Sequence, residues 1–519
     1  MFIEKSMKIK NALLIVPPFC TLYNDFHDAP LLGVSSLSAV LSKEGYNVYV
    51  LNTDNKKHSL EVTKHSPYKK NIIDEESEKT YLNLINNLNA SLWQRIKKEV
   101  EYYSPDIVGI TTLTSTYHSS INIAKIVKSI DKRIIVVLGG IHPTSVPQQV
   151  LNNEEVDFVV RGEGEYTFLN LIKSLSYDIS LEKVKGISYK KDGKIIHNEP
   201  ANLIDNLDLL PFPLKEVDID ISTYSSNSLG EIMTARGCPY SCIYCASHLV
   251  WGKRVRFRSI ENVLSEIVYT KRRFGTEYFV FSDDSFNINR NRVITFCENI
   301  KKRKLNIRWW CEIRAYPFDE EMLRKMKESG CVSIALGIET GNKVTMERIK
   351  KGITLEQVKR CVELIKKYDI ELNTFFMIGF PWETKEQIRD TVNFMKKVSP
   401  TGVVNLSVVT PYPGTELYKI LVEEKMIEES FNWLGFMHHR RTNFFNKYFS
   451  DSEFLHVFEN AEKEVEKVNI KNFLVRTLKK QLLSPRKVIE YIVKYTKNPK
   501  GLYLKIMEYY RAILKILSR

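Results

Sequence analysis

Short apolar runs alternate with amphipathic stretches along the first 200 residues. The runs are rich in β-branched residues and lie at 11–19, 46–52, 106–113, 133–140 and 157–165. Between most of them, apolar residues recur at helical spacing, as at Leu37, Val40 and Leu41. This rhythm predicts an open, doubly wound parallel sheet with helices on both faces, in which ligands bind at the carboxyl ends of the strands.

Two segments depart from this rhythm. Residues 53–100 form a charged insertion, with a helical pattern near 80–102. Residues 186–200 predict a hairpin that turns at Asp192 and Gly193, because Asp-Gly suits a two-residue turn. The stretch after the hairpin has the composition of a linker. We therefore assign residues 1–200 to a first, Rossmann-like domain and residues 201–224 to a linker.

The second half of the chain repeats a strand and a helix six times. The predicted strands lie at 231–235, 277–284, 307–314, 332–339, 371–380 and 403–410. Two of the helices open with capping boxes, Thr354 with Gln357 and Thr384 with Gln387. Six such units predict a partial (βα)6 barrel of the TIM type over residues 225–425, with its chemistry at the carboxyl ends of the strands. Residues 426–519 complete the α/β chain as a small, basic, helical C-terminal region.

Composition and charge narrow the class of protein. The chain is 43% hydrophobic and 27% charged, which is typical of a soluble globular protein. The longest uncharged run, 134–153, contains Gly and Pro, so no apolar helix of about 20 residues is predicted and we interpret the chain as cytoplasmic. Residues 471–519 carry thirteen Lys or Arg against two Glu, which is +11 of the net charge of +14. The near-neutral remainder argues against a nucleic-acid groove through the body of the protein.

The last stretch, residues 501–519, has a broad apolar face and a stripe of mostly basic side chains. Three interpretations stay open. One is a terminal helix packed on the barrel. The second is an interfacial helix in peripheral contact with the inner, anionic face of a membrane, which a lipid substrate would explain. The third is RNA binding, which is less favoured because no aromatic stacking platform lies between the charges.

Three of the eight cysteines demand a chemical explanation. Cys238, Cys242 and Cys245 follow the first barrel strand at the spacing C-x3-C-x2-C, whereas the other five are scattered and fit small buried hydrophobes. A structural zinc site needs a fourth ligand, which His248 would supply. An electron-carrying [4Fe–4S] cluster needs four cysteines. Three cysteines instead leave one iron open, and an open metal position binds a substrate or a cofactor.

This cysteine spacing, with Tyr244 before the third cysteine, resembles the radical S-adenosylmethionine (SAM) superfamily. The resemblance implies a [4Fe–4S] cluster whose open iron is chelated by the amino and carboxylate groups of SAM. Segments after the later strands extend the likeness. Asp283 and Asp284 are candidates for the methionine amino group, Arg314 for its carboxylate, and Glu339 for the ribose or the amine of SAM.

The first domain resembles the cobalamin-binding domain of the B12-dependent radical SAM group, in the segments "GGIHPTSVP" and "VVRGEGE". The resemblance implies that glycines let the backbone approach a corrin, with hydrogen bonds from nearby side chains. The implied cobalamin site comprises Gly139, Gly140, His142, Thr144, Gly162, Glu163 and Gly164. "DFHDAP" departs from D-x-H-x-x-G at Pro30, so no histidine ligand below cobalt is expected. A sheet that binds no corrin is the alternative.

These likenesses imply an enzyme that cleaves SAM to a 5′-deoxyadenosyl radical. The leading hypothesis is a cobalamin-dependent methyltransferase that methylates an unactivated carbon of a small-molecule or lipid substrate. Such an enzyme needs an external electron donor of the flavodoxin or ferredoxin type. The first alternative is a radical SAM oxidative cyclase that acts on a lipid or a tetrapyrrole. A non-enzymatic iron–sulfur or zinc protein is the alternative from another class.

Overall fold

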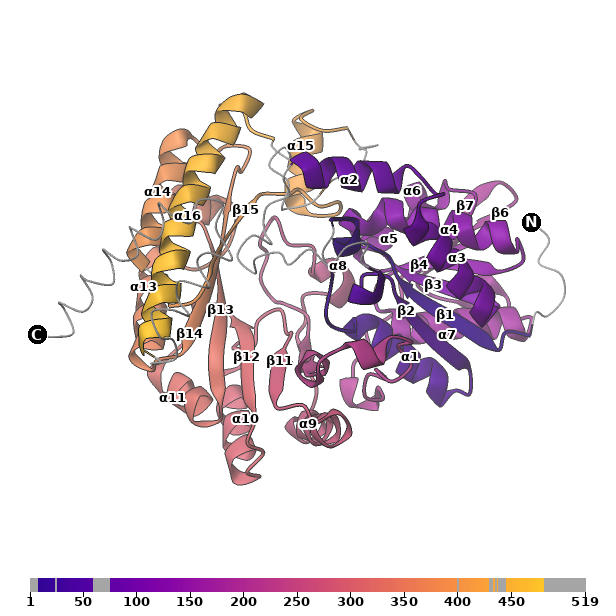
Figure 1. Ribbon diagram of the computed structural model, residues 1–519, viewed down its shortest axis with the longest axis horizontal. Helices are drawn as coiled ribbons and strands as arrows, with labels where there is room; N and C mark the ends of the chain where they lie inside the picture. Colours follow the sequence, from indigo (N-terminus) through magenta and orange to yellow (C-terminus); the bar gives the residue numbers. More distant parts are fainter. Residues whose placement is uncertain are drawn as a thin grey trace, which may run out of the picture.

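The chain forms two large, mainly parallel β-sheets with helices packed on them, joined by a linker and a C-terminal region (Figure 1). The computed structural model describes residues 8–23, 26–58, 75–398, 401–428, 433–434, 436 and 445–479. In Figure 1 the first sheet and its helices, indigo to magenta, lie beside the second sheet, whose strands run from red to orange. No helix within these residues is long and apolar enough to cross a membrane.

The first sheet has seven strands in the order β2-β1-β3-β4-β5-β6-β7. Its first five strands are parallel: β1 Asn11–Val16, β2 Asn47–Asn52, β3 Ile107–Thr111, β4 Ile135–Gly139 and β5 Phe158–Val160. The predicted hairpin is confirmed as β6 Ile187–Lys191 and β7 Lys194–His197, which extend the sheet antiparallel to β5. Its turn places Asp192 and Gly193 at φ of 51° and 75°, the left-handed region that a type I′ turn requires.

Helices cover both faces of this sheet, which confirms the doubly wound prediction. On one face α3 Ser91–Tyr103 and α4 Tyr117–Ile130 bury Trp93 and Ile123 against the strands. On the other face α1 Leu32–Lys43 and α7 Gly164–Ser176 bury Val40 and Phe168. Two short helices, α5 Ile141–Ser145 and α6 Pro147–Leu151, follow β4.

The single helix expected near 80–102 is wrong, because the structure has two helices there. α2 Glu75–Ile85 ends before the segment Asn86–Ala90, and α3 begins at Ser91. The Asn87 side chain accepts a hydrogen bond from the backbone N–H of Asn89 at 3.1 Å. Asn side chains offer the backbone such local bonds in place of helical ones, which is the physical reason for the break.

The second sheet has six parallel strands in the order β15-β14-β13-β12-β11-β8. The strands are β8 Glu231–Ile232, β11 Tyr278–Phe281, β12 Arg308–Ile313, β13 Cys331–Glu339, β14 Glu371–Ile378 and β15 Val404–Val408. Since β8 and β15 are its two edges, the barrel is open, as predicted. The strand expected at 231–235 divides, because β9 Ala235–Arg236 leaves the sheet and pairs antiparallel with β10 Arg256–Phe257.

Helices cover the outer face of the barrel. They are α9 Ile260–Phe274, α10 Arg290–Lys302, α11 Glu320–Glu328, α12 Lys343–Arg348, α13 Leu355–Lys367 and α14 Lys385–Val398. Both predicted capping boxes form at the starts of α13 and α14. On β12 the residues Trp309, Cys311 and Ile313 are buried against these helices. The alternate residues of β12 therefore face the barrel interior.

The C-terminal region contacts both halves of the molecule. After α15 Glu416–Glu423, the side chains of Ile427, Trp433 and Phe436 join the core of the first domain. Tyr418 and Leu421 of α15 belong to the same core cluster. α16 Asp451–Lys479 then returns to the barrel, where it buries Phe454 and Phe458. The interfacial helix expected at 501–519 lies outside the described residues, and the expected domain boundaries stay predictions.

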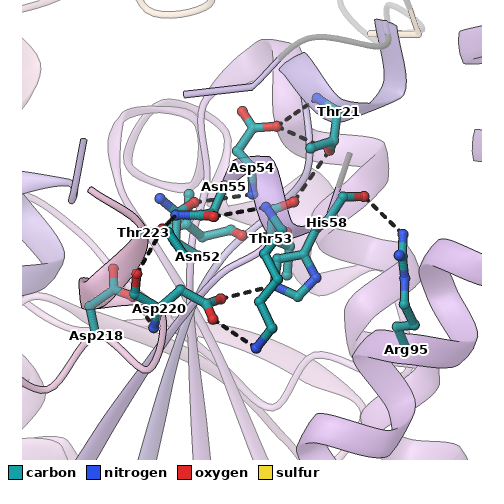
Figure 2. A network of polar contacts seen from close by, with 12 residues as sticks. Thr21, Asn52, Thr53, Asp54, Asn55, His58, Arg95, Asp218, Asp220 and Thr223 are labelled. Carbon is teal, nitrogen blue, oxygen red and sulfur yellow. Dashed lines mark hydrogen bonds and ion pairs between the residues drawn. The ribbon is translucent and has the colours of Figure 1, made fainter. Parts of the chain in front are cut away.

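The linker is fixed to the carboxyl end of β2 by polar contacts (Figure 2). Buried Asp220 accepts from Lys57 Nζ at 2.8 Å and lies 3.1 Å from His58 Nε2. The Asn55 amide donates to Thr223 Oγ1 at 2.7 Å. Figure 2 also shows Arg95 on the other side of His58, whose carbonyl oxygen accepts from Arg95 Nη2 at 2.8 Å. This network holds the end of the linker against the first domain.

Candidate functional site

The cysteine loop runs from β9 to α8 His248–Trp251 and is held by backbone bonds. Gly237 has a φ of 96°, and a Cβ there would lie 2.4 Å from the carbonyl oxygen of Arg254, so only glycine fits. The N–H of Ile243 donates to the carbonyl of Ile349 at 3.2 Å. Cys238, Cys242 and Cys245 are free thiols and are partly exposed on this loop.

The thiols meet a fixed positive charge. Arg314 follows β12, and its Nη1 lies 3.9 Å from Cys242 Sγ. Burial raises the pKa of Cys238, and it raises the pKa of Cys245 to about 11. Metal binding must therefore displace protons from these two thiols. Within the described residues, no three His, Cys, Asp or Glu side chains surround one single-ion position.

Arg314 has donors to spare. Its guanidinium lies 3.6 Å from the centre of the Tyr240 ring, a cation–π contact that fixes its plane. The side chain is buried, and its Nε and Nη2 atoms have no hydrogen-bond partner among the residues that the structure describes. Buried donors of this kind are costly to leave unsatisfied, so the geometry suits a planar anion such as a carboxylate.

A second polar group combines Glu339, Lys351 and Tyr244. Lys351 Nζ lies 2.7 Å from Glu339 Oε1 and 3.2 Å from the Tyr244 hydroxyl, and all three side chains are largely enclosed. Glu339 ends β13 with a φ of 72°. A left-handed conformation is strained for a residue other than glycine and is common at functional sites. Burial raises the pKa of Tyr244 well above its usual value, so this phenol stays protonated.

The two adjacent aspartates have different environments. The Asp283 carboxylate is buried and accepts from Thr234 N at 2.6 Å, Thr234 Oγ1 at 2.5 Å and Ala235 N at 2.9 Å. Burial raises its pKa to about 6. Asp284 instead accepts from Ser247 Oγ at 2.6 Å, beside the cysteine loop. Asp283 thus holds the backbone before the cysteines, and only Asp284 of the two reaches the cavity described next.

A cavity of about 460 Å³ separates the cysteine loop from the first sheet. Its walls are mostly apolar. On the sheet side it is lined by glycines, namely Gly33, Gly109, Gly139, Gly140, Gly162 and Gly164. On the barrel side it is lined by Ala246, Ser247, Val250, Trp251 and Asp284. At Gly33 and Gly162 an added Cβ would meet nothing within 4 Å, so both glycines border open space.

Comparison with known families accounts for both walls of this cavity. Residues 232–395 match the radical SAM superfamily, and residues 21–172 match the B12 binding domain. An uncharacterized methyltransferase of Pyrococcus horikoshii is 37% identical over 341 residues, which are 65% of this chain and 74% of that protein. The chain belongs to the radical SAM enzymes that carry a B12-binding domain. Its cofactors are accordingly a [4Fe–4S] cluster, SAM and cobalamin, as predicted.

Other relatives of this radical SAM enzyme differ in the reaction that their names state. The anaerobic magnesium-protoporphyrin IX monomethyl ester cyclase of Rubrivivax gelatinosus is 29% identical over 336 residues, 63% of this chain and 60% of the cyclase. Among solved structures, the radical SAM methyltransferase TsrM of Kitasatospora setae superposes with a TM-score of 0.61 at 19% identity, covering 80% of this chain and 75% of TsrM. The cobalamin-dependent enzyme OxsB gives 0.60 at 20% identity, covering 97% and 71%. These two structures support the fold.

The residues present fit these cofactors. Three thiols on one loop are the donor set for a cluster with one open iron. The unsatisfied atoms of Arg314 fit the carboxylate of SAM. The six glycines that line the cavity, called the glycine edge below, leave open space at Gly33 and Gly162. A corrin can occupy this space, which side chains would otherwise fill.

Three residues predicted for the cobalamin site do not line the cavity. His142 is fully buried, with its ring centre 4.6 Å from that of Tyr117 and 5.4 Å from that of Trp433, and burial lowers its pKa to about 3. Thr144 Oγ1 donates to the carbonyl of Gly140 at 2.7 Å and accepts from the N–H of Gly162 at 3.0 Å. These two residues therefore lie outside the cavity lining, and Thr144 holds the backbone of Gly140 and Gly162.

The third residue, Glu163, joins the two domains instead. It accepts from Arg236 Nη1 at 2.9 Å and from Arg256 Nη1 at 2.8 Å, and all three side chains are buried. Glu165 pairs with Arg236 Nη2 at 2.5 Å. The Arg236 guanidinium also lies 4.7 Å from the centre of the Trp251 ring, which lines the cavity. Sequence reasoning missed this network because its members lie 71 to 93 residues apart.

Sequence reasoning also missed Lys351 and Glu312. Lys351 lies in a Lys-rich turn that carries no pattern. Glu312 lies on the interior face of β12, beside Asp284, Glu339 and Lys351. A signal was present for Glu312, because Arg308, Glu312 and Arg314 are charged residues at even spacing along a predicted strand.

Proposed function

We propose that this radical SAM enzyme transfers a methyl group to an unactivated carbon with the help of cobalamin. One observation carries the proposal: a single cavity has the glycine edge of the B12-binding domain as one wall and residues directly after the third cysteine as the other. A methyl donor on the first wall and a radical generated at the second therefore share one enclosed space. The methyltransferase relative from Pyrococcus horikoshii supports the same reaction class.

Chemistry of this kind has a physical reason. A carbon without an acidic proton cannot become a nucleophile, so it must be opened by removal of a hydrogen atom. When bound, the cofactors supply the electron, the 5′-deoxyadenosyl radical and the methyl group. The chain supplies position and shelter, because Val250, Trp251 and Phe168 line the cavity with apolar surface that excludes water.

The polar residues around the cysteine loop each have a role in this reaction. Arg314 binds the carboxylate of SAM through the two donors that the protein leaves unsatisfied. Glu339 presents its second carboxylate oxygen to the ribose or amine of SAM while Lys351 holds the first at 2.7 Å. Asp284, oriented by Ser247, accepts from the methionine amino group. Asp283 keeps the backbone of Thr234 and Ala235 in place below the cysteine loop.

This reaction needs an electron donor and a substrate. The sequence contains no second cysteine group for an internal relay, so the electron comes from an external flavodoxin- or ferredoxin-type donor. The substrate is a small molecule or a lipid. Peripheral contact with a membrane through residues 501–519 stays a prediction from their sequence.

Labelled SAM tests methyl transfer without a known substrate. The protein is reconstituted anaerobically with iron, sulfide and hydroxocobalamin, reduced, and incubated with SAM that carries a trideuterated methyl group. We expect the deuterated methyl group to be recovered on cobalamin by mass spectrometry. If 5′-deoxyadenosine forms while no label reaches cobalamin, methyl transfer is wrong and an oxidative cyclase becomes the better interpretation. A product that gains one methylene unit, against one that loses hydrogen, makes the same distinction once a substrate is found.

Two variants serve as controls for that experiment. Cys238→Ala removes a cluster ligand and is expected to abolish the visible absorption of the cluster. Cys361→Ala removes a buried thiol of α13 that packs in the barrel core, and it is expected to keep that absorption. If neither variant changes the absorption, the cluster does not reside at the three-cysteine loop. A zinc site in place of a cluster would show metal without visible absorption.

A further inference from the structure

Three side chains of different chemistry lie along the interior face of strand β12. Arg308, Trp310 and Glu312 alternate with Trp309, Cys311 and Ile313, which are buried under the helices. The three interior residues therefore project into the barrel, from its amino end to its carboxyl end. A base, an aromatic ring and an acid follow one another along this one strand.

A second cavity, of about 560 Å³, covers the amino half of this face. Its walls come from the starts of β11 to β15 and from α16, at the end of the barrel opposite the cysteine loop. Aromatic side chains line it at Tyr278, Trp310 and Phe375, and Phe375 is 38% exposed although it lies inside the barrel. Exposed aromatic rings in a hollow interior are a surface for a flat or apolar ligand.

Two arginines line this cavity, and only one of them has an acidic partner among the described residues. Arg476 pairs with Glu371 at 2.5 Å across the cavity wall. The Arg308 guanidinium makes no hydrogen bond or ion pair within the part of the chain that the structure describes, and it lies 5.8 Å from the centre of the Tyr278 ring. An exposed guanidinium held over an aromatic ring is preorganised to bind a carboxylate or a phosphate.

Glu312 lies at the other end of the series. Its carboxylate is exposed to the barrel interior and has no hydrogen-bond partner among the described residues. Enclosure raises the pKa of this carboxyl, with the negative charges of Asp284 and Glu339 adding to the effect. SAM binding as proposed above does not use Glu312, so this acceptor is free for the substrate.

We infer that the barrel interior binds an elongated substrate with an anionic group at one end, a flat unsaturated middle and a hydrogen-bond donor near the reacting carbon. Arg308 binds the anion, Trp310 and Phe375 contact the flat part, and Glu312 accepts from the donor. Arg308 and Glu312 are four positions apart along a parallel strand, which is about 13 Å. This inference rests on the proposed function, because it places the reacting carbon at the cysteine end of the barrel.

A fluorescent probe pair tests the anion site. The probes are 1-pyrenebutyrate, which is a flat aromatic anion, and 1-pyrenebutanol, its neutral counterpart. Binding is measured by fluorescence anisotropy on the protein loaded with cluster, cobalamin and SAM, so that the cofactor cavity is filled. We expect saturable binding of both probes, with the butyrate at least tenfold tighter than the butanol.

Variants assign this preference to the series on β12. Arg308→Gln is expected to make the two probes bind equally, and Arg308→Lys to retain part of the preference. Trp310→Leu is expected to weaken both probes by a similar factor. Arg272→Gln on α9, which removes another exposed arginine, is the matched control and should change neither probe. Cluster absorption and the cobalamin spectrum report whether each variant is folded and loaded.

Two results would overturn the inference. One is a preference for the butyrate that survives in Arg308→Gln, which would place the anion site elsewhere. The other is the absence of saturable binding of either probe to the loaded protein. Both readouts are independent of turnover. A protein that transfers label from SAM to cobalamin and fails the probe test loses this substrate class only, whereas the opposite pattern contradicts the proposed function.

Discussion

Replacement of Glu163 by Gln tests what holds the B12-binding domain against the barrel. The Glu163 carboxylate accepts from Arg236, from Arg256 and from the N–H of Ile204, and it is buried. Gln has nearly the same shape and lacks the charge. The substitution therefore leaves two guanidinium groups in place and removes the anion between them.

The structure gives the expected magnitude. Arg236 keeps Glu165 as a partner, whereas Arg256 keeps only the carbonyl oxygens of Ile204 and Trp251, at 2.8 and 2.9 Å. Breaking a buried ion pair and leaving one charge uncompensated costs about 3–5 kcal/mol. The exposed pair of Lys191 and Glu182 is the matched control, and Glu182→Gln should lower the free energy of unfolding far less than Glu163→Gln, because solvent screens an exposed pair.

Urea denaturation followed by tryptophan fluorescence measures these differences. The first transition is compared, because a chain of two domains need not unfold in one step. The double variant Glu163→Gln, Arg256→Met removes the charge that the single variant leaves unpaired, so its loss should fall short of the sum of the two single losses by about 2 kcal/mol. A loss under about 1 kcal/mol for Glu163→Gln, or strictly additive losses, would refute the reasoning that this network carries the domain interface.

Four further outcomes follow from the structure. Arg314→Met should weaken SAM binding to the reconstituted enzyme by about 10- to 100-fold in calorimetry, since hydrogen bonds from a charged donor contribute about 1.5–3 kcal/mol. Arg314→Lys should lose less affinity. Equal affinity of all three proteins for SAM would show that Arg314 does not bind it. Gly33→Val should fill the cavity beside the glycine edge and weaken hydroxocobalamin binding at least tenfold by absorption titration, and an unchanged affinity would contradict a corrin at this edge. Burial raises the pKa of Glu383 to about 7 from an ordinary 4.5, so the wild type loses stability as pH rises through that range. Glu383→Gln should lack this loss, and above pH 7 its free energy of unfolding should rise by about 3 kcal/mol relative to the wild type. Parallel pH profiles of the two proteins in thermal unfolding would contradict this prediction. In the folded apo protein a thiol reagent should modify the partly exposed cysteines, and the buried Cys297, Cys311, Cys331 and Cys361 should react only after denaturation.

The sequence predicted what depends on local pattern. The six βα units, the Asp192-Gly193 hairpin and the capping box at Thr354 each arise from residues close together in the chain, and each is present in the structure. The cysteine spacing is local as well, which is why the family could be identified from it. Four glycines of the glycine edge were expected because the segments that contain them resemble a cobalamin-binding domain.

What depends on tertiary packing could not be predicted. Glu163 was assigned to cobalamin because it lies between two glycines of that edge, yet its side chain turns to arginines 73 and 93 residues further along the chain. Asp283 and Asp284 are equivalent in sequence, and only the packing of the backbone at Thr234 separates their environments. The open cavity inside the barrel depends on which residues of five strands face one another, and no single strand shows it.

Quantification of 5′-deoxyadenosine tests whether the three-cysteine loop holds a cluster that cleaves SAM. The reduced, reconstituted protein is incubated with SAM under anaerobic conditions, beside the three variants in which Cys238, Cys242 or Cys245 is replaced by Ala and beside Cys361→Ala. We expect the wild type and Cys361→Ala to form 5′-deoxyadenosine, and we expect none from the three loop variants. If a loop variant forms 5′-deoxyadenosine at the wild-type rate, or if the fully loaded wild type forms none, SAM cleavage by a cluster on this loop is wrong.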